Sequence, residues 1–135
     1  MTVQLVVGAV IVDDVARPAR VLAARRSGTL AGYWEFPGGK VEPDEQPRSA
    51  LVREIREELG TEVEVVDQIG EDGADWPISE TLKLRLYGCR IVGSDPAAGT
   101  SHDLLAWLSA ADLDAHDWLE SDRAALPTVR QWLGW

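Results

Sequence analysis

Three glutamates lie unusually close together in the segment REIREELG. Glu54, Glu57 and Glu58 fall within five residues. Residues three or four apart share a helix face, where like charges repel by about 0.2–0.5 kcal/mol per pair. A hard divalent cation would relieve this repulsion, because Mg²⁺ and Mn²⁺ prefer carboxylate oxygens as ligands. The alternative is a solvated acidic face whose charge is balanced by Arg53 and Arg56.

The spacing of these acids predicts a helix that presents them on one side. At about 100° per residue, the three carboxylates span a face roughly 100° wide. A neighbouring apolar face can seat the helix on a sheet and consists of Leu51, Val52, Ile55 and Leu59. We expect the helix to begin at Pro47, a residue that suits the first helical position, and to end near Gly60. Gln46 is a mediocre N-cap for it.

Strand patterns surround this helix. Apolar, β-branched runs predict a hairpin before it, formed by Gln4–Val12 and Val21–Arg26. Further strands are expected after the helix at Glu62–Ile69, Thr81–Val92 and Leu104–Leu108. Short helical structure is expected at Ser109–Leu113, and a second long helix at Ser121–Leu133. The element order predicts an α/β fold with helices packed on a mixed sheet.

A pair of glycines precedes the acidic helix. After the extended segment YWEF, we expect Gly38 and Gly39 to form a tight turn. Glycine lets the backbone approach a ligand closely. The turn therefore predicts a binding site beside the glutamates.

Composition limits the functions that this chain can have. Its 135 residues suit one domain spanning residues 1–135, and its net charge of −10 disfavours binding to nucleic acid or to an anionic membrane. The apolar run Leu5–Val12 is too short to span a bilayer. A single cysteine, Cys89, and the lack of a signal peptide predict a cytoplasmic protein. An anionic substrate would need divalent cations to bridge it to this acidic protein.

The segment Gly38–Gly60 resembles the Nudix box, the signature of the Nudix hydrolases. The matching positions are Gly39, Glu45, Arg53, Glu54, Ile55, Glu57, Glu58 and Gly60. Thr61 departs from the pattern, since the family prefers an aliphatic residue there, but this is a packing position. The segment LAGYWEFPGGKVEPDE and the C-terminal half resemble the MutT branch and its cytidine-triphosphate pyrophosphohydrolase-like relatives. The resemblance implies an α/β/α sandwich.

The resemblance also implies roles for the residues of the box. Glu54, Glu57 and Glu58, with the Gly39 carbonyl, would bind Mg²⁺, or Mn²⁺ as an alternative. Glu54 or Glu57 would also orient or deprotonate the attacking water. Family members differ in this base, and a base in the later loop, where Asp95 and Asp103 are weak candidates, stays open.

The ion pair inside the box and the residues that bind the substrate follow from the same resemblance. Arg53 would hold Glu45 or a neighbouring carboxylate in place. Arg26 and Lys40 would contact phosphates, although Arg26 could equally be a surface strand-end arginine. Asp122 matches the position that reads the base, and a plain helix N-cap is its alternative. Phe36 could contact the base through its backbone or its ring, or be a core aromatic.

The MutT branch favours nucleoside triphosphates and releases a nucleoside monophosphate and pyrophosphate. A carboxylate at Asp122 accepts hydrogen bonds and suits the amino group of cytosine or the N1/N2 edge of guanine. We therefore expect 8-oxo-dGTP, dCTP or CTP as the substrate of a monomer or homodimer. ADP-ribose hydrolysis is one alternative, and nucleotide sensing without turnover is another.

Overall fold

The computed structural model describes residues 2–71 and 74–135. These residues form eight strands, two α-helices and one 3-10 turn. The strands are β1 (Gln4–Val12), β2 (Val21–Arg26), β3 (Trp34–Glu35), β4 (Gly38–Lys40), β5 (Val63–Gln68), β6 (Trp76–Pro77), β7 (Leu82–Ile91) and β8 (His102–Leu108). The helices are α1 (Pro47–Leu59) and α2 (Glu120–Leu133), and the 3-10 turn η1 spans Leu113–Ala115.

All eight strands belong to one mixed sheet. Its main path runs β3-β2-β1-β7-β5, with β4 paired to β1, β6 to β7 and β8 to β2. Strands β1 and β7 are parallel along their whole length, from the pair Gln4–Leu82 to the pair Val12–Arg90. The other pairings are antiparallel, including the predicted hairpin of β1 and β2.

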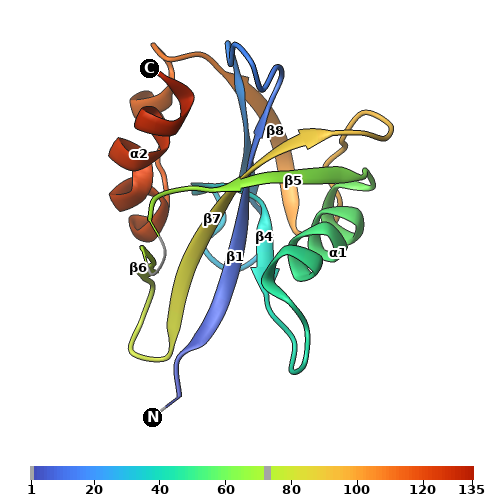
Figure 1. Ribbon diagram of the computed structural model, residues 1–135, viewed down its shortest axis with the longest axis vertical. Helices are drawn as coiled ribbons and strands as arrows, with labels where there is room; N and C mark the ends of the chain where they lie inside the picture. The colour runs from blue at the N-terminus through green and yellow to red at the C-terminus, as the bar shows by residue number, and fades with distance from the viewer. Residues whose placement is uncertain (1, 72–73) are drawn as a thin grey trace.

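The two helices cover opposite faces of this sheet, as Figure 1 shows. Alternate residues of β1 point to opposite faces. Val10 and Val12 join the core cluster that contains Val129 of α2, whereas Val7 and Ile11 join the cluster beneath α1. The predicted α/β/α sandwich with a mixed sheet is therefore confirmed.

Helix α1 has the bounds that its sequence predicted. Pro47 lies in its first turn, and Gln46 makes no capping hydrogen bond through its side chain. Gly60 ends the helix in the left-handed conformation, at φ 64°, and its N–H donates to the Arg56 carbonyl. This conformation favours glycine, which lacks the Cβ that would be strained there. The buried residues of the helix include Leu51 and Ile55, so its apolar face packs on the sheet.

The expectation of a turn at Gly38–Gly39 is wrong, because both glycines lie in strand β4. They pair antiparallel with Gly8 and Val7 of β1. A Cβ on Gly38 would overlap the Val7 carbonyl, so glycine is required here by close backbone contact and not by a turn. The backbone at Gly39 does lie close to one of the predicted site residues, because Gly39 lies against Glu54.

Other boundaries shift by short distances. Strand β8 begins at His102 instead of Leu104, since its pairing with β2 continues to Arg26 past a bulge. The 3-10 turn lies later than the helical structure expected at Ser109–Leu113. The two-residue strand β6 was not predicted, because two residues are too few to show a pattern. Within the described residues, no helix is both long and apolar enough to cross a membrane.

Two backbone hydrogen bonds fix the start of α2. The Trp34 N–H donates to the Asp117 carbonyl over 2.8 Å, and the Leu119 N–H donates to the Trp34 carbonyl over 2.9 Å. Leu119 is consequently the N-cap residue, and the helix starts one residue earlier than predicted. Pro127 lies inside α2 without ending it. The first turn of α2 is thereby attached to strand β3.

Candidate active site

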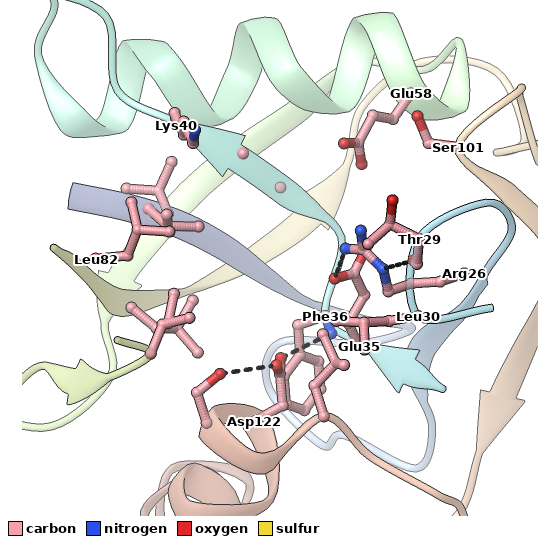
Figure 2. Close-up of a pocket in the computed structure, with 18 of the residues that line it drawn as sticks. Arg26, Thr29, Leu30, Glu35, Phe36, Lys40, Glu58, Leu82, Ser101 and Asp122 are labelled. Atoms are coloured by element: carbon pink, nitrogen blue, oxygen red, sulfur yellow. Dashed lines mark hydrogen bonds and ion pairs between the residues drawn. The ribbon is translucent and has the colours of Figure 1, made fainter. Parts of the chain in front are cut away.

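A pocket of about 470 Å³ opens between the two helices at the β4 side of the sheet. Figure 2 shows Glu58 of α1 at one end and Asp122 of α2 at the other, with Arg26 and Glu35 between them. Six residues with predicted roles line it: Arg26, Phe36, Gly39, Lys40, Glu58 and Asp122. One pocket thus receives groups from both helices and from five of the strands, β1, β2, β3, β4 and β7.

Glu58 is a partly buried carboxylate with an unpaired oxygen. Its Oε2 is buried and has no hydrogen-bond partner among the described residues. Burial is the main cause that raises the pKa of Glu58 to about 8, and the negative charges of Glu35 and Glu54 add to it. The Gly38 backbone and Arg26 act in the opposite direction. A buried oxygen without a hydrogen-bond donor fits a ligand of a cation.

The Glu54 carboxylate packs directly against the backbone of Gly39. A Cβ at Gly39 would overlap both oxygens of this carboxylate. Any larger residue at position 39 would therefore displace the Glu54 carboxylate. The contact places this carboxylate, a hard oxygen ligand, against the backbone of strand β4.

Arg53 ties the acids of the box together. Its Nε and Nη2 donate to the two oxygens of Glu45 over 2.8 and 2.9 Å, a bidentate arrangement. Its Nη1 donates to Glu54 over 2.9 Å and to Glu57 over 3.3 Å. The Arg53 bonds are the main cause that lowers the pKa of Glu45 to about 2. The expected contact between Arg53 and Glu45 is present, together with one to Glu54.

The described residues do not bring three acidic side chains into a preformed cluster for a metal ion. Glu57 is 59% exposed and bonds to Arg53, and neither it nor Glu54 lines the pocket. The candidate ligand atoms nevertheless fit a hard divalent ion, since all of them are oxygens and one oxygen of Glu58 has no hydrogen-bond partner among the described residues. Only one oxygen of Glu57 bonds to Arg53, so the other is open to a cation.

Asp122 forms the other end of the pocket and is 3% exposed. Its Oδ2 accepts a hydrogen bond from the Phe36 N–H over 3.1 Å, and the Ser121 hydroxyl donates to Oδ1 over 3.5 Å. Burial is the first cause that raises its pKa to about 7. The N-cap alternative is wrong, because Leu119 holds that position.

The remaining predicted residues differ in what they offer the pocket. Phe36 is 3% exposed and its ring contacts Trp118, with 4.7 Å between ring centroids, so its side chain belongs to the core. Lys40 is exposed at the rim. Arg26 is tied to the Thr29 carbonyl and to Glu35. Asp103, the weak candidate for a base, bonds to Arg25 instead, and neither Asp103 nor Asp95 lines the pocket.

Sequence reasoning missed Glu35 as a residue of the pocket. Glu35 accepts from Arg26 over 3.0 Å and contacts the buried His102 over 2.8 Å. A signal was present, because Trp34 and Phe36 flank it and both are buried. Alternation along an extended segment turns the middle residue to the opposite side, where a carboxylate needs partners.

Comparisons with known proteins agree with this architecture. A family profile described as NUDIX domain matches residues 2–129. The chain is 43% identical over 119 residues to the Mycobacterium tuberculosis protein named "Putative 8-oxo-dGTP diphosphatase 2", covering 84% of this chain and 82% of that one. It is 50% identical over 62 residues to the Escherichia coli CTP pyrophosphohydrolase, covering 44% of this chain and 46% of that one.

Solved structures give the same result. The E. coli ORF135 protein superposes with a TM-score of 0.78 at 32% identity, covering 97% of this chain and 91% of that one. A MutT Nudix hydrolase from Burkholderia pseudomallei superposes with a TM-score of 0.75 at 30% identity, covering 96% and 99%. The fold, the box on α1 and these matches together show that the chain belongs to the Nudix hydrolase family.

Proposed function

We propose that this chain is a single-domain, MutT-like pyrophosphohydrolase that cleaves a nucleoside triphosphate into a nucleoside monophosphate and pyrophosphate. The main support is the pocket, which has an unpaired buried carboxylate of Glu58 at one end and a buried, hydrogen-bonded carboxyl of Asp122 at the other. This arrangement suits an anionic, metal-bound group at the first end and a polar base at the second. We further propose a cytoplasmic monomer or homodimer that acts on free nucleotides and not on nucleic acid or membranes.

Nudix hydrolases generally require a divalent metal ion, and we propose Mg²⁺, with Mn²⁺ as a substitute. Glu54, Glu57, Glu58 and the Gly39 carbonyl are its proposed ligands. Such an ion supplies charge neutralisation and lowers the pKa of bound water. Glu54 or Glu57 would orient the attacking water. The Glu45–Arg53 pair would hold Glu54 at the Gly39 backbone.

The polyphosphate would lie between the metal ligands and two cationic side chains. Lys40 follows Gly39 on strand β4, and Arg26 reaches the pocket from the end of β2. Positive groups near phosphate oxygens also matter because the protein as a whole carries a net charge of −10. Local cations and the metal together would offset the repulsion that this acidic surface exerts on a triphosphate.

Asp122 would read the base. Its Oδ2 accepts from the Phe36 N–H, and its Oδ1 accepts only the long bond of 3.5 Å from the Ser121 hydroxyl, so this pocket-lining carboxyl keeps acceptor capacity for a base. Cytosine offers its amino group to such an acceptor, and 8-oxoguanine offers its N1/N2 edge. Nucleotides of these two bases occur in the names of the relatives, 8-oxo-dGTP in that of the M. tuberculosis protein and CTP in that of the E. coli protein. We therefore propose 8-oxo-dGTP, dCTP or CTP as substrates.

A substrate panel tests this proposal. The protein would be incubated with Mg²⁺ and, separately, 8-oxo-dGTP, dGTP, dCTP, CTP, 5-methyl-dCTP and ADP-ribose, and the products resolved by chromatography. We expect a monophosphate and pyrophosphate from 8-oxo-dGTP or from a cytidine nucleotide. Cleavage of ADP-ribose alone would overturn the proposed substrate class. Tight binding of one nucleotide without any turnover would show a sensor instead of an enzyme.

A further inference from the structure

The hydrogen bonds of Glu35 connect the pocket to a histidine beneath it. One oxygen of Glu35 accepts from Arg26 Nη1 over 3.0 Å, and the other lies 2.8 Å from His102 Nε2. The Glu35 side chain is 14% exposed, whereas the His102 side chain is 0% exposed. His102 does not line the pocket, so it can affect a substrate only through its neighbours, and its side chain bonds to Glu35.

The strand register brings these three side chains together. Strand β2 lies between β3 and β8, with Ala24 opposite Glu35 on one side and Arg26 opposite His102 on the other. The register of β2 and β8 shifts between Arg25 and Arg26. Bulges of this kind turn a side chain towards a new direction and are frequent beside active sites.

His102 makes this contact at a cost to stability. An ionised Glu35 can only accept, so Nε2 of His102 is the donor in this contact and Nδ1 is left to find another partner. Nδ1 is buried and has no hydrogen-bond partner among the described residues. A buried polar atom without a partner destabilises the folded state. A histidine held here in spite of that cost is better explained by its bond to Glu35 than by packing.

The orientation of the Arg26 guanidinium depends on the same bonds. Its Nε donates to the Thr29 carbonyl over 2.9 Å and its Nη1 donates to Glu35. A guanidinium is planar, so two fixed donors define the direction of the others. The remaining N–H groups belong to a side chain that lines the pocket. Figure 2 shows both bonds and the guanidinium between Glu35 and Thr29.

We propose that His102 is a positioning residue that, by holding Glu35, sets the Arg26 guanidinium in the orientation that binds the polyphosphate of the substrate. This inference rests on the proposed function in one respect, namely that Arg26 contacts phosphate. It adds a residue outside the pocket and outside the box to the set that determines substrate affinity.

Two substitutions at one position form the test. Glutamine carries its amide nitrogen as many bonds from Cβ as His102 Nε2, whereas asparagine carries it only as far as Nδ1. His102→Gln should therefore retain the donor to Glu35 and His102→Asn should lose it. We expect His102→Asn to raise the KM for the triphosphate about tenfold with a smaller change in kcat, and His102→Gln to restore KM to within about threefold of wild type.

The same substitution in an Arg26→Ala variant distinguishes a positioning role of His102 from a general loss of structure. With Arg26→Ala already present, His102→Asn should weaken the kcat/KM by less than about twofold, because the two residues act on one contact. Equal losses in both backgrounds, or equal KM values for the Asn and Gln variants with all proteins folded by circular dichroism, would overturn the proposal.

Calorimetric titration with Mg²⁺ and inorganic tripolyphosphate distinguishes failure of this inference from failure of the proposed function. If wild type hydrolyses no triphosphate, the proposed function fails. Weaker tripolyphosphate binding by His102→Asn than by His102→Gln would still support the positioning role, and identical binding would overturn it.

Discussion

Glu58 and Asp122 face the same pocket from opposite helices, and burial raises the pKa of both. They differ in what they bond to. Asp122 accepts from the Phe36 N–H, whereas Glu58 Oε2 has no partner among the described residues. A carboxyl that already has a backbone donor can select a neutral polar group. Glu58 also interacts with the Gly38 backbone but keeps one buried oxygen without a hydrogen-bond donor, which suits a cation, so the two ends of the pocket suit different parts of one ligand.

Glu57→Gln should have the largest effect, at the Glu58 end. It removes a proposed metal ligand and should lower kcat by about a hundredfold or more. Steady-state kinetics with the substrate found by the panel would measure this. Glu62→Gln is a matched control, because Glu62 is also exposed and pairs with an arginine, Arg56, outside the pocket. A Glu57→Gln enzyme within about tenfold of wild type, or about 1.4 kcal/mol in barrier, would contradict the proposed metal site.

The raised pKa of Asp122 predicts a pH dependence of stability. Between its ordinary value of 3.8 and about 7, the folded state binds a proton that the unfolded state has lost. The free energy of unfolding therefore falls as pH rises through this window. Asp122→Asn lacks this contribution, so its stability relative to wild type should increase from pH 4 to pH 8 by up to about 4 kcal/mol. Urea denaturation at each pH would measure it, and a constant difference would contradict it.

Base selection should change with the same substitution and leave the other end of the pocket intact. An amide at position 122 can still accept from the Phe36 N–H but presents both a donor and an acceptor to the base. We expect Asp122→Asn to alter the ratio of kcat/KM between the preferred nucleotide and its nearest competitor about tenfold. The metal concentration that gives half-maximal rate should stay the same. A uniform loss on all nucleotides would show that Asp122 does not read the base.

Thr61→Val should have the smallest effect. Thr61 is 2% exposed, and its hydroxyl donates to the Ser94 carbonyl, away from the pocket. Valine restores the aliphatic residue that the family prefers but loses this hydrogen bond, so stability should fall by about 1 kcal/mol or less. Thermal unfolding and the kcat would be measured together. A change in kcat greater than about twofold would show that this end of the box is coupled to the site.

Local patterns in the sequence predicted the elements that depend on neighbouring residues. Helix α1 was bounded correctly because Pro47 and Gly60 each act within one turn of the chain. Strand β4 was mistaken for a turn because its conformation is imposed by its pairing with β1. In that pairing Gly38 lies opposite Gly8, which is 30 residues earlier in the sequence. Nothing in a Gly-Gly pair reveals such a partner.

The same distinction explains the outcome for the candidate site. The box supplied the pocket residues Gly39 and Glu58, and its spacing also put Arg53 beside Glu45. The roles of these residues stay predictions that the kinetic tests above address. Glu35 was missed because its partners, Arg26 and His102, belong to two other strands whose register includes a bulge. The N-cap alternative for Asp122 failed because a distant strand fixes where α2 starts.

The adjacency of Glu35 and Phe36 has a consequence for the length of the substrate. Glu35 holds the arginine on the phosphate side, and the N–H of Phe36 holds the carboxyl on the base side. Because these two contacts start from adjacent residues of one extended segment, Arg26 and Asp122 are held at a fixed separation. A nucleotide seated against Asp122 would then have a set number of phosphates within reach of Arg26. We expect the diphosphate of the preferred nucleoside to be cleaved at least about tenfold more slowly than its triphosphate. Equal rates would show that this separation does not select the number of phosphates.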